Sequence, residues 1–160
     1  MSMLSAGLGL AVRIVLVLLF FPFSALDKVL NFRGAIGQAS EVASSRPLAI
    51  VLILGGICIE VFMSLGVVTG IADRACAFVL AVYCGLTALL WKQFWKPGDF
   101  WASSTGKGRT LFWDFLKNFA LGAGFLLITF GQDGSAAGQF FAAPFASSHP
   151  YHHAQMKRQP

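Results

Sequence analysis

The stretch LGLAVRIVLVLLFFPFSAL, residues 8–26, decides the fold of this chain. Its one charged residue is Arg13, and its length is close to the roughly 20 helical residues that cross the hydrocarbon core of a bilayer. A removable leader peptide would begin with a basic residue and end at small residues in both key positions. No basic residue precedes Leu8, and Phe23 stands before Ser24. The stretch therefore predicts a retained transmembrane helix.

Three more apolar stretches of similar length follow, and the composition agrees with a membrane setting. They cover residues 48–69, 75–94 and 112–131. Hydrophobic residues make up 56% of the chain and charged residues 12%, about half the charged share of an average soluble domain. None of the four stretches shows the alternation of a β-barrel strand, so each must satisfy its backbone hydrogen bonds as a helix.

The predicted fold class is all-α, an integral membrane four-helix bundle with a flexible C-terminal tail. Residues 1–131 form the helical domain, and residues 132–160 form the tail. The tail is rich in Gly, Ala, Ser and Pro and lacks helical periodicity, which is typical of flexible segments. Three aromatic residues interrupt this pattern: Phe140, Phe141 and Phe145. They leave two alternatives open, simple disorder or contact with lipid or a partner subunit.

The basic residues in the loops predict the orientation of the bundle. The loops at 27–47 and 95–111 would share one side, and their basic residues are Lys28, Arg33, Arg46, Lys96, Lys107 and Arg109. On the other side only Arg74 lies close to a helix end. Because loops rich in basic residues stay in the cytoplasm, we expect a multi-pass protein of the bacterial inner membrane with both termini in the periplasm. Four tryptophans gather at the cytoplasmic end, as in an interfacial aromatic belt: Trp91, Trp95, Trp101 and Trp113.

Charged residues inside the spans are the candidate site, because placing a charge in a bilayer is costly. Arg13 lies roughly 7 Å, and Glu60 roughly 14 Å, from the outer end of its helix at 1.5 Å per residue. An arginine side chain can bridge that difference, so we expect an Arg13–Glu60 ion pair. Near the cytoplasmic boundary five polar residues are expected to converge: Asp27, Lys28, Asp114, Lys117 and Asn118. The most natural partner of Lys117 is then Asp27.

Two interpretations of these polar residues remain open. In the first, the ion pairs are structural and fix the register of the helices. In the second, the residues line a pocket for a polar or quinone-like headgroup, or carry protons. The predicted substrate-binding residues of the second interpretation are Arg13, Asp27, Lys28, Glu60, Lys117 and Asn118.

Several kinds of chemistry lack the residues that they need. The three histidines lie in the tail, at His149, His152 and His153, so bis-histidine haem ligation within the bundle is excluded. The three cysteines form no C-x-x-C pair, and Walker, Rossmann and hydrolase motifs are missing. The basic residues are scattered singly, which argues against a nucleic-acid partner. We predict no catalytic residue, no metal site and no intrinsic cofactor.

The order of several motifs resembles the DoxX family. The first span carries Arg13-Ile-Val-Leu and then Ser24-Ala-Leu-Asp27-Lys28-Val-Leu-Asn31-Phe. The later motifs are Glu60 amid Gly55, Gly56 and Gly66, the pair Phe94-Trp95, and Phe115-Leu-Lys117-Asn118-Phe-Ala-Leu-Gly122. The resemblance covers roughly residues 12–131. The family usually has Gly near the position of Ser24 or Ala25, so this chain departs from the pattern there.

The resemblance implies a four-helix inner-membrane protein. The namesake of the family is the membrane subunit of a thiosulfate:quinone oxidoreductase, and other members are linked to oxidative-stress complexes or have no assigned activity. Carried over by position, the family-like polar residues are Arg13, Lys28, Glu60, Lys117 and Asn118.

Two functions follow as hypotheses. The first is an accessory subunit of a respiratory or redox membrane complex, which does no chemistry itself and is favoured by the lack of a redox-cofactor motif. The second is the membrane subunit of a quinone-linked oxidoreductase that depends on a partner for electrons. Both imply the lipid bilayer and other membrane-complex subunits as partners, and the second adds quinone as a ligand. A small transporter is disfavoured, because the helices are short and no internal repeat is visible.

Overall fold

The computed structural model describes residues 3–101, 105–131, 134 and 136–151 of the 160-residue chain. These residues form helices and connecting loops, with no strand among them. Four helical stretches are long and apolar enough to cross a membrane: Ala6–Leu30, Arg46–Thr69, Asp73–Trp91 and Lys107–Phe130. They overlie the four predicted spans. The prediction of an all-α membrane bundle is confirmed.

The first two spans are each interrupted by a π-helical turn. The first span consists of α1 (Met3–Leu18), the turn η1 (Leu19–Ser24) and α2 (Ala25–Leu30), and the second of α4 (Arg46–Cys58), the turn η2 (Ile59–Met63) and α5 (Ser64–Thr69). Pro22 lies inside η1 and has no N–H to donate, and Phe21 leaves helical geometry at φ −126° and ψ 119°. The first span therefore bends at this point. The two turns lie against each other near the middle of the membrane-spanning region.

The starts of two helices are satisfied by local side chains. Between the first two spans lies the short helix α3 (Phe32–Ala39), and α4 begins after Ser45, whose hydroxyl accepts the N–H of Leu48. The third and fourth spans are α6 (Asp73–Trp91) and α7 (Lys107–Phe130). The Asp99 carboxylate accepts the first two N–H groups of α7, each at 2.8 Å. This carboxylate supplies partners for donors that have none within the helix.

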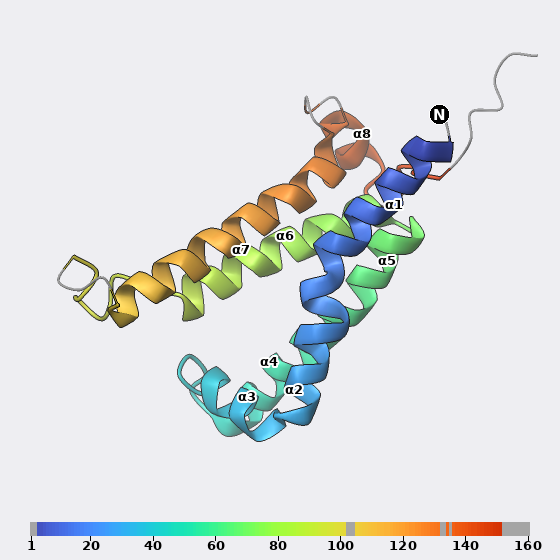
Figure 1. Ribbon diagram of the computed structural model, residues 1–160. Coiled ribbons are helices and arrows are strands. Elements are labelled where there is room, and N and C mark those ends of the chain that lie inside the picture. Colours follow the sequence, from blue (N-terminus) through green and yellow to red (C-terminus); the bar gives the residue numbers. More distant parts are fainter. Residues whose placement is uncertain (1–2, 102–104, 132–133, 135, 152–160) are drawn as a thin grey trace, which may run out of the picture.

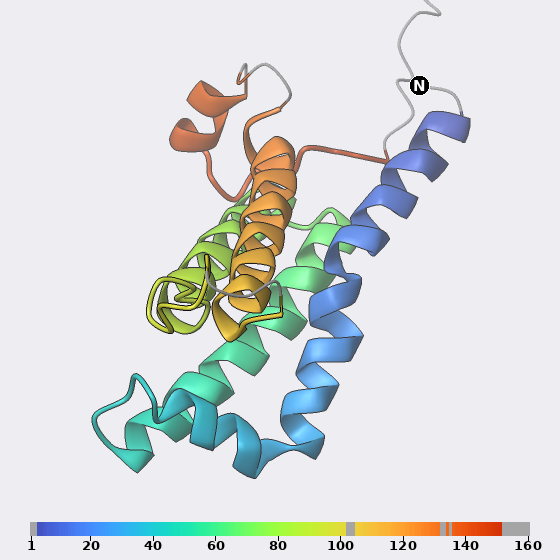
Figure 2. The same ribbon diagram turned by 60° about the vertical axis from the view of Figure 1, so that its left-hand side comes forward.

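The spans are arranged as two arms that meet at one end and diverge at the other (Figure 1). In one arm the first span lies beside the second, and in the other α6 lies along α7. Figure 2 shows the same pairing from another side, with α3 at the diverging end. We call the diverging end the inner end, and the end that holds the N-terminus and α8 (Ala137–Ala142) the outer end.

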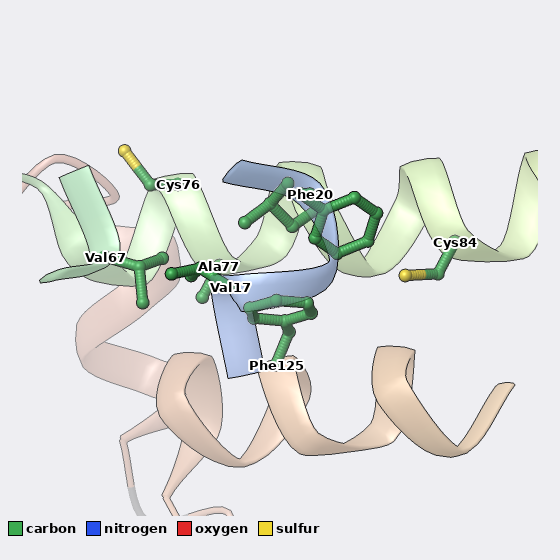
Figure 3. Close-up of a cluster of buried hydrophobic side chains, with 8 residues drawn as sticks. Val17, Phe20, Val67, Cys76, Ala77, Cys84 and Phe125 are labelled. Carbon is green, nitrogen blue, oxygen red and sulfur yellow. The ribbon is translucent and has the colours of Figure 1, made fainter. Parts of the chain in front are cut away.

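The core lies where the two arms meet. Figure 3 shows Val17 and Phe20 of the first span beside Phe125 of α7, with Cys76 and Cys84 at opposite ends of this cluster on α6. Two glycines permit the close approach. A Cβ on Gly66 would lie 2.3 Å from the Cys76 sulfur, and one on Gly122 would lie 3.4 Å from the Cβ of Cys84. Many apolar side chains point away from this core, among them Val15, Val51 and Leu127, as expected of helices that face lipid.

The described part of the tail is held against the bundle. Phe140 of α8 is 6% exposed and packs between Phe78 and Phe130, with ring centroids 5.3 and 5.5 Å away. The neighbouring Phe141 and Phe145 are exposed. Of the three tail phenylalanines, Phe140 is buried against this chain's own helices and the Phe141 ring centroid lies 6.2 Å from that of Phe130, a possibility that the sequence alternatives did not include.

Candidate functional site

The interrupted helices bring four polar side chains together inside the bundle. The Glu60 side chain comes from η2 and is 1% exposed. Its Oε1 accepts hydrogen bonds from Lys28 Nζ at 2.6 Å, Ser24 Oγ at 3.0 Å and Tyr83 Oη at 3.0 Å. Lys28 Nζ also donates to Ser24 Oγ at 2.6 Å. We call Ser24, Lys28, Glu60 and Tyr83 the inner network.

The π-helical turns explain why these side chains converge. Ser24 ends η1 and Glu60 lies in η2, and the wider turn rotates the residues that follow it relative to a regular helix. Lys28 is one helical turn beyond Ser24, so both can reach the same carboxylate oxygen. Tyr83 approaches from α6 because Gly56 leaves room for it: a Cβ on Gly56 would lie 3.1 Å from the Tyr83 hydroxyl.

A pocket of about 460 Å³ adjoins the inner network and lies between the two arms. Its lining includes the four network residues, apolar and aromatic side chains, and further polar groups: Leu19, Phe20, Ile53, Trp91, Asp27, Asn31, Gln38, Thr87, Lys92 and Asn118. Trp91 Nε1 donates to the Gln38 carbonyl at 3.0 Å, which ties α3 to α6 across the inner side of the pocket. The pocket thus has a polar end inside the membrane-spanning region and aromatic side chains in its walls.

A second ion pair lies at the outer end of the bundle. Arg13 Nη1 is 2.7 Å from Asp73 Oδ2, and Arg13 also donates to the Val67 carbonyl at 2.8 Å and to Ser148 Oγ at 3.1 Å. Ser148 in turn donates its N–H to Asp73 Oδ1 at 2.8 Å and its hydroxyl to Asp73 Oδ2. The Asp73 side chain is fully buried and that of Arg13 is 10% exposed. We call Arg13, Asp73 and Ser148 the outer cluster.

The segment after α8 lies across the outer end of the bundle and places Ser148 there. The Tyr151 hydroxyl donates to the Val68 carbonyl at the end of the second span. Pro150 lies against Gly70, where a Cβ would be 3.1 Å from Pro150 Cγ. Burial raises the pKa of the Tyr151 hydroxyl, so this donor stays protonated at neutral pH. We call residues 143–151 the strap.

The predicted Arg13–Glu60 ion pair is wrong. Each residue is paired with a different partner, Arg13 with Asp73 and Glu60 with Lys28. The depth estimate placed the two charges within reach of each other, but depth does not determine the direction in which each helix face points. The hydrophobic cluster that includes Val17 and Phe20 occupies the same stretch of the first span between Arg13 and Ser24.

The predicted Asp27–Lys117 pair is also wrong. Lys117 lies 3.5 Å from Asp114 on its own helix, and its side chain is 75% exposed. Asp114 also contacts Lys92 at 3.3 Å. Because α7 packs mainly along α6, Lys117 does not reach the first span. Asp27 lines the pocket and takes part in no ion pair among the described residues.

The predicted convergence near the inner end is therefore correct in part. Asp27, Lys28 and Asn118 line one pocket, whereas Asp114 and Lys117 do not. Four participating residues were missed: Ser24, Asp73, Tyr83 and Ser148. Ser24 and Lys28 are four residues apart in the first span, a spacing that could have indicated a shared partner. Nothing in the sequence pattern indicated Ser148.

Within the described residues, no group of three or more His, Cys, Asp or Glu side chains could hold a metal ion. Of the predicted tail histidines, His149 lies in the strap, and His152 and His153 are outside the described residues.

Comparison with known proteins gives one family. The family model described as DoxX matches residues 8–93, a range that contains both Arg13 and the whole inner network. No curated protein and no solved structure matches the chain. The matched range ends before α7, α8 and the strap.

Proposed function

The chain belongs to the DoxX family of membrane proteins, and on that premise we propose that it is the quinone-binding membrane subunit of a redox complex, with a partner supplying the electrons. The observation that carries this proposal is the pocket of about 460 Å³ that ends on the inner network. Buried charges in a membrane span are costly and are usually functional. Here the buried Glu60 and the partly buried Lys28 adjoin a pocket large enough for a ring-sized headgroup.

Lys28 is the residue best placed to contact such a headgroup. An ammonium group has three N–H donors, and two of those of Lys28 are used by Ser24 and Glu60. Its side chain is 21% exposed and lines the pocket, so one donor is left for a quinone carbonyl oxygen. The positive charge would also stabilise negative charge that develops on that oxygen as the ring is reduced. Phe20 and Trp91 supply aromatic surface for the ring itself.

The test is binding of decylubiquinone to the purified chain in lipid nanodiscs. Lys28→Met should weaken binding roughly tenfold, as expected when a hydrogen bond to a charged group is lost. The matched control is Lys117→Met, which removes a lysine that does not line the pocket. Because Lys28→Met leaves Glu60 without its cation, the double variant Lys28→Met/Glu60→Gln provides a neutral version of the same site. Unchanged binding in folded forms of both Lys28 variants would contradict the proposal.

An accessory role without chemistry is the second candidate, and a groove on the lipid-facing side of α6 and α7 favours it. The groove has a volume of about 350 Å³, and four small residues, Ala81, Gly85, Gly122 and Ala123, lie in its lining among larger ones such as Phe78 and Phe119. In lipid, small residues let a further helix approach closely. If this role is correct, Ala123→Leu should prevent assembly of the complex, while Lys28→Met should leave both assembly and turnover unchanged.

The orientation stays part of the proposal: the inner end, with its basic loops, faces the cytoplasm of a bacterial cell and both termini face the periplasm. A reporter fused after Pro160 should be active in the periplasm, and one inserted between Lys96 and Arg109 in the cytoplasm. The reverse pattern would place the pocket on the periplasmic side.

A further inference from the structure

The two oxygens of the Glu60 carboxylate have different surroundings. Oε1 accepts three hydrogen bonds, from Lys28, Ser24 and Tyr83. Oε2 is buried and has no hydrogen-bond partner among the described residues. An unsatisfied oxygen of a buried carboxylate is costly, so this asymmetry needs a physical explanation.

Ser64 shows the same anomaly one turn further along the second span. It is 1% exposed, and its hydroxyl also lacks a partner among the described residues. Helical hydroxyls elsewhere in the chain bond the carbonyl four residues earlier, as Thr69, Thr87 and Thr129 do at 2.8, 2.9 and 3.2 Å. For Ser64 that carbonyl would be the one of Glu60, which lies inside the π-helical turn η2, where the regular spacing is lost.

We infer that Glu60 Oε2 and Ser64 Oγ together bind one water molecule inside the bundle. Glu60 and Ser64 are both buried and lie four residues apart in the second span. Ser64 is not part of the pocket lining, so a ligand in the pocket would not satisfy its hydroxyl. Buried waters in proteins typically bridge polar groups that otherwise lack partners.

This water gives Glu60 a partner in both of its protonation states. It donates a hydrogen bond to Oε2 when the carboxylate is ionised, and accepts one from Oε2–H when the carboxyl group is protonated. Lys28, Ser24 and Tyr83 can meanwhile stay on Oε1. Glu60 can thus take up or release a proton beside a headgroup that a partner's reductant is reducing. This role in proton exchange rests on the proposed function, whereas the presence of the water does not.

The chain is well suited to a direct test, because it contains two glutamates, Glu41 and Glu60. Labelling with ¹³C-glutamate therefore gives two side-chain carboxyl signals in solid-state NMR of the full chain in lipid. Glu41 is exposed and serves as an internal reference for contact with bulk water. Transfer of magnetisation from water protons to the Glu60 carboxyl carbon reports the buried water.

We expect this transfer in the wild-type chain and its loss in Ser64→Ala. It should be retained in Ser24→Ala, because the Ser24 hydroxyl bonds Glu60 Oε1 and not Oε2. No transfer in the wild type, or equal transfer in Ser64→Ala, would overturn the inference. Absence of the transfer in the wild type overturns the inference even if Ser64→Ala fails to fold. Decylubiquinone binding is measured on the same samples: normal binding without the water signal refutes this inference alone. A water signal without binding refutes the proposed function alone.

Discussion

The inner network and the outer cluster are each built on one buried ion pair, but they differ in how completely their polar atoms are satisfied. In the outer cluster Asp73 receives bonds from Arg13 and from both donors of Ser148, and the strap covers the end of the bundle. In the inner network one oxygen of Glu60 is left without a partner, and Lys28 borders a pocket. A saturated and covered pair is suited to fixing helices in place, and an unsaturated pair beside a pocket is suited to binding.

This difference predicts that the outer cluster dominates stability. Asp73→Leu should lower the free energy of unfolding by about 3–5 kcal/mol, because it leaves Arg13 buried without its counter-charge. Titration of the chain in mixed micelles with a denaturing detergent measures this change. The control is Asp114→Leu, which breaks a partly exposed pair and should cost at most about 1 kcal/mol.

The double variant Arg13→Leu/Asp73→Leu should be more stable than Asp73→Leu alone, because no lone charge remains. Strictly additive losses of unfolding free energy would show that the two side chains do not interact. The outer cluster would then not be stabilised by an ion pair.

The inner network should affect stability less and binding more. Glu60→Leu should cost about 1–3 kcal/mol, since Lys28 lines the pocket and its side chain is 21% exposed in the wild type. The same variant should reduce decylubiquinone binding, measured in nanodiscs, because Lys28 loses the acceptor that positions it. A stability loss as large as that of Asp73→Leu, with binding intact, would mean that both pairs are structural.

The sequence was sufficient to predict the four spans and that Arg13 and Glu60 would lie inside the bundle, but not the partners of these two charges. Arg13 and Glu60 are both buried, as the cost of lipid exposure requires. Their pairing failed because two features are invisible in a hydropathy pattern. The π-helical turns change which face Ser24 and Glu60 present, and α6 begins at Asp73, two residues before the predicted start of the third span, so this acidic residue was not counted inside the bundle.

The strap could not be predicted for a different reason. Its composition is that of a flexible segment, and its contacts are made at single positions that carry no periodic pattern. Ser148 contacts residues that are 135 and 75 positions away in the chain. Such contacts depend on the assembled outer end of the bundle, and local propensity contains no information about them.

The contribution of the strap to the outer cluster can be isolated with one hydroxyl. Ser148→Ala should cost about 1 kcal/mol of unfolding free energy, because the backbone N–H of residue 148 still bonds Asp73. Amide hydrogen exchange should become faster over residues 143–151 if the hydroxyl helps to hold the strap. Ser147→Ala is the matched control, since the Ser147 hydroxyl accepts the His149 N–H within the strap and has no hydrogen bond to the outer cluster in the described part of the chain. Faster exchange in the control alone would show that local turns, and not the outer cluster, hold the strap.

The smallest effect is expected at Lys117, which is a predicted substrate-binding residue in the same way as Lys28. Both lysines lie close to the inner end of a span, and both belong to the family-like positions, yet only Lys28 lines the pocket. The Lys117 side chain is 75% exposed and contacts Asp114 on its own helix, and such exposed pairs contribute little. Lys117→Met should therefore change the free energy of unfolding by no more than about 0.5 kcal/mol and leave decylubiquinone affinity unchanged. If Lys117→Met weakened binding as much as Lys28→Met, the ligand would have to contact the exposed face of α7. The inner network would then not be the binding site. It would differ from the outer cluster only in that its ion pair is more accessible to solvent.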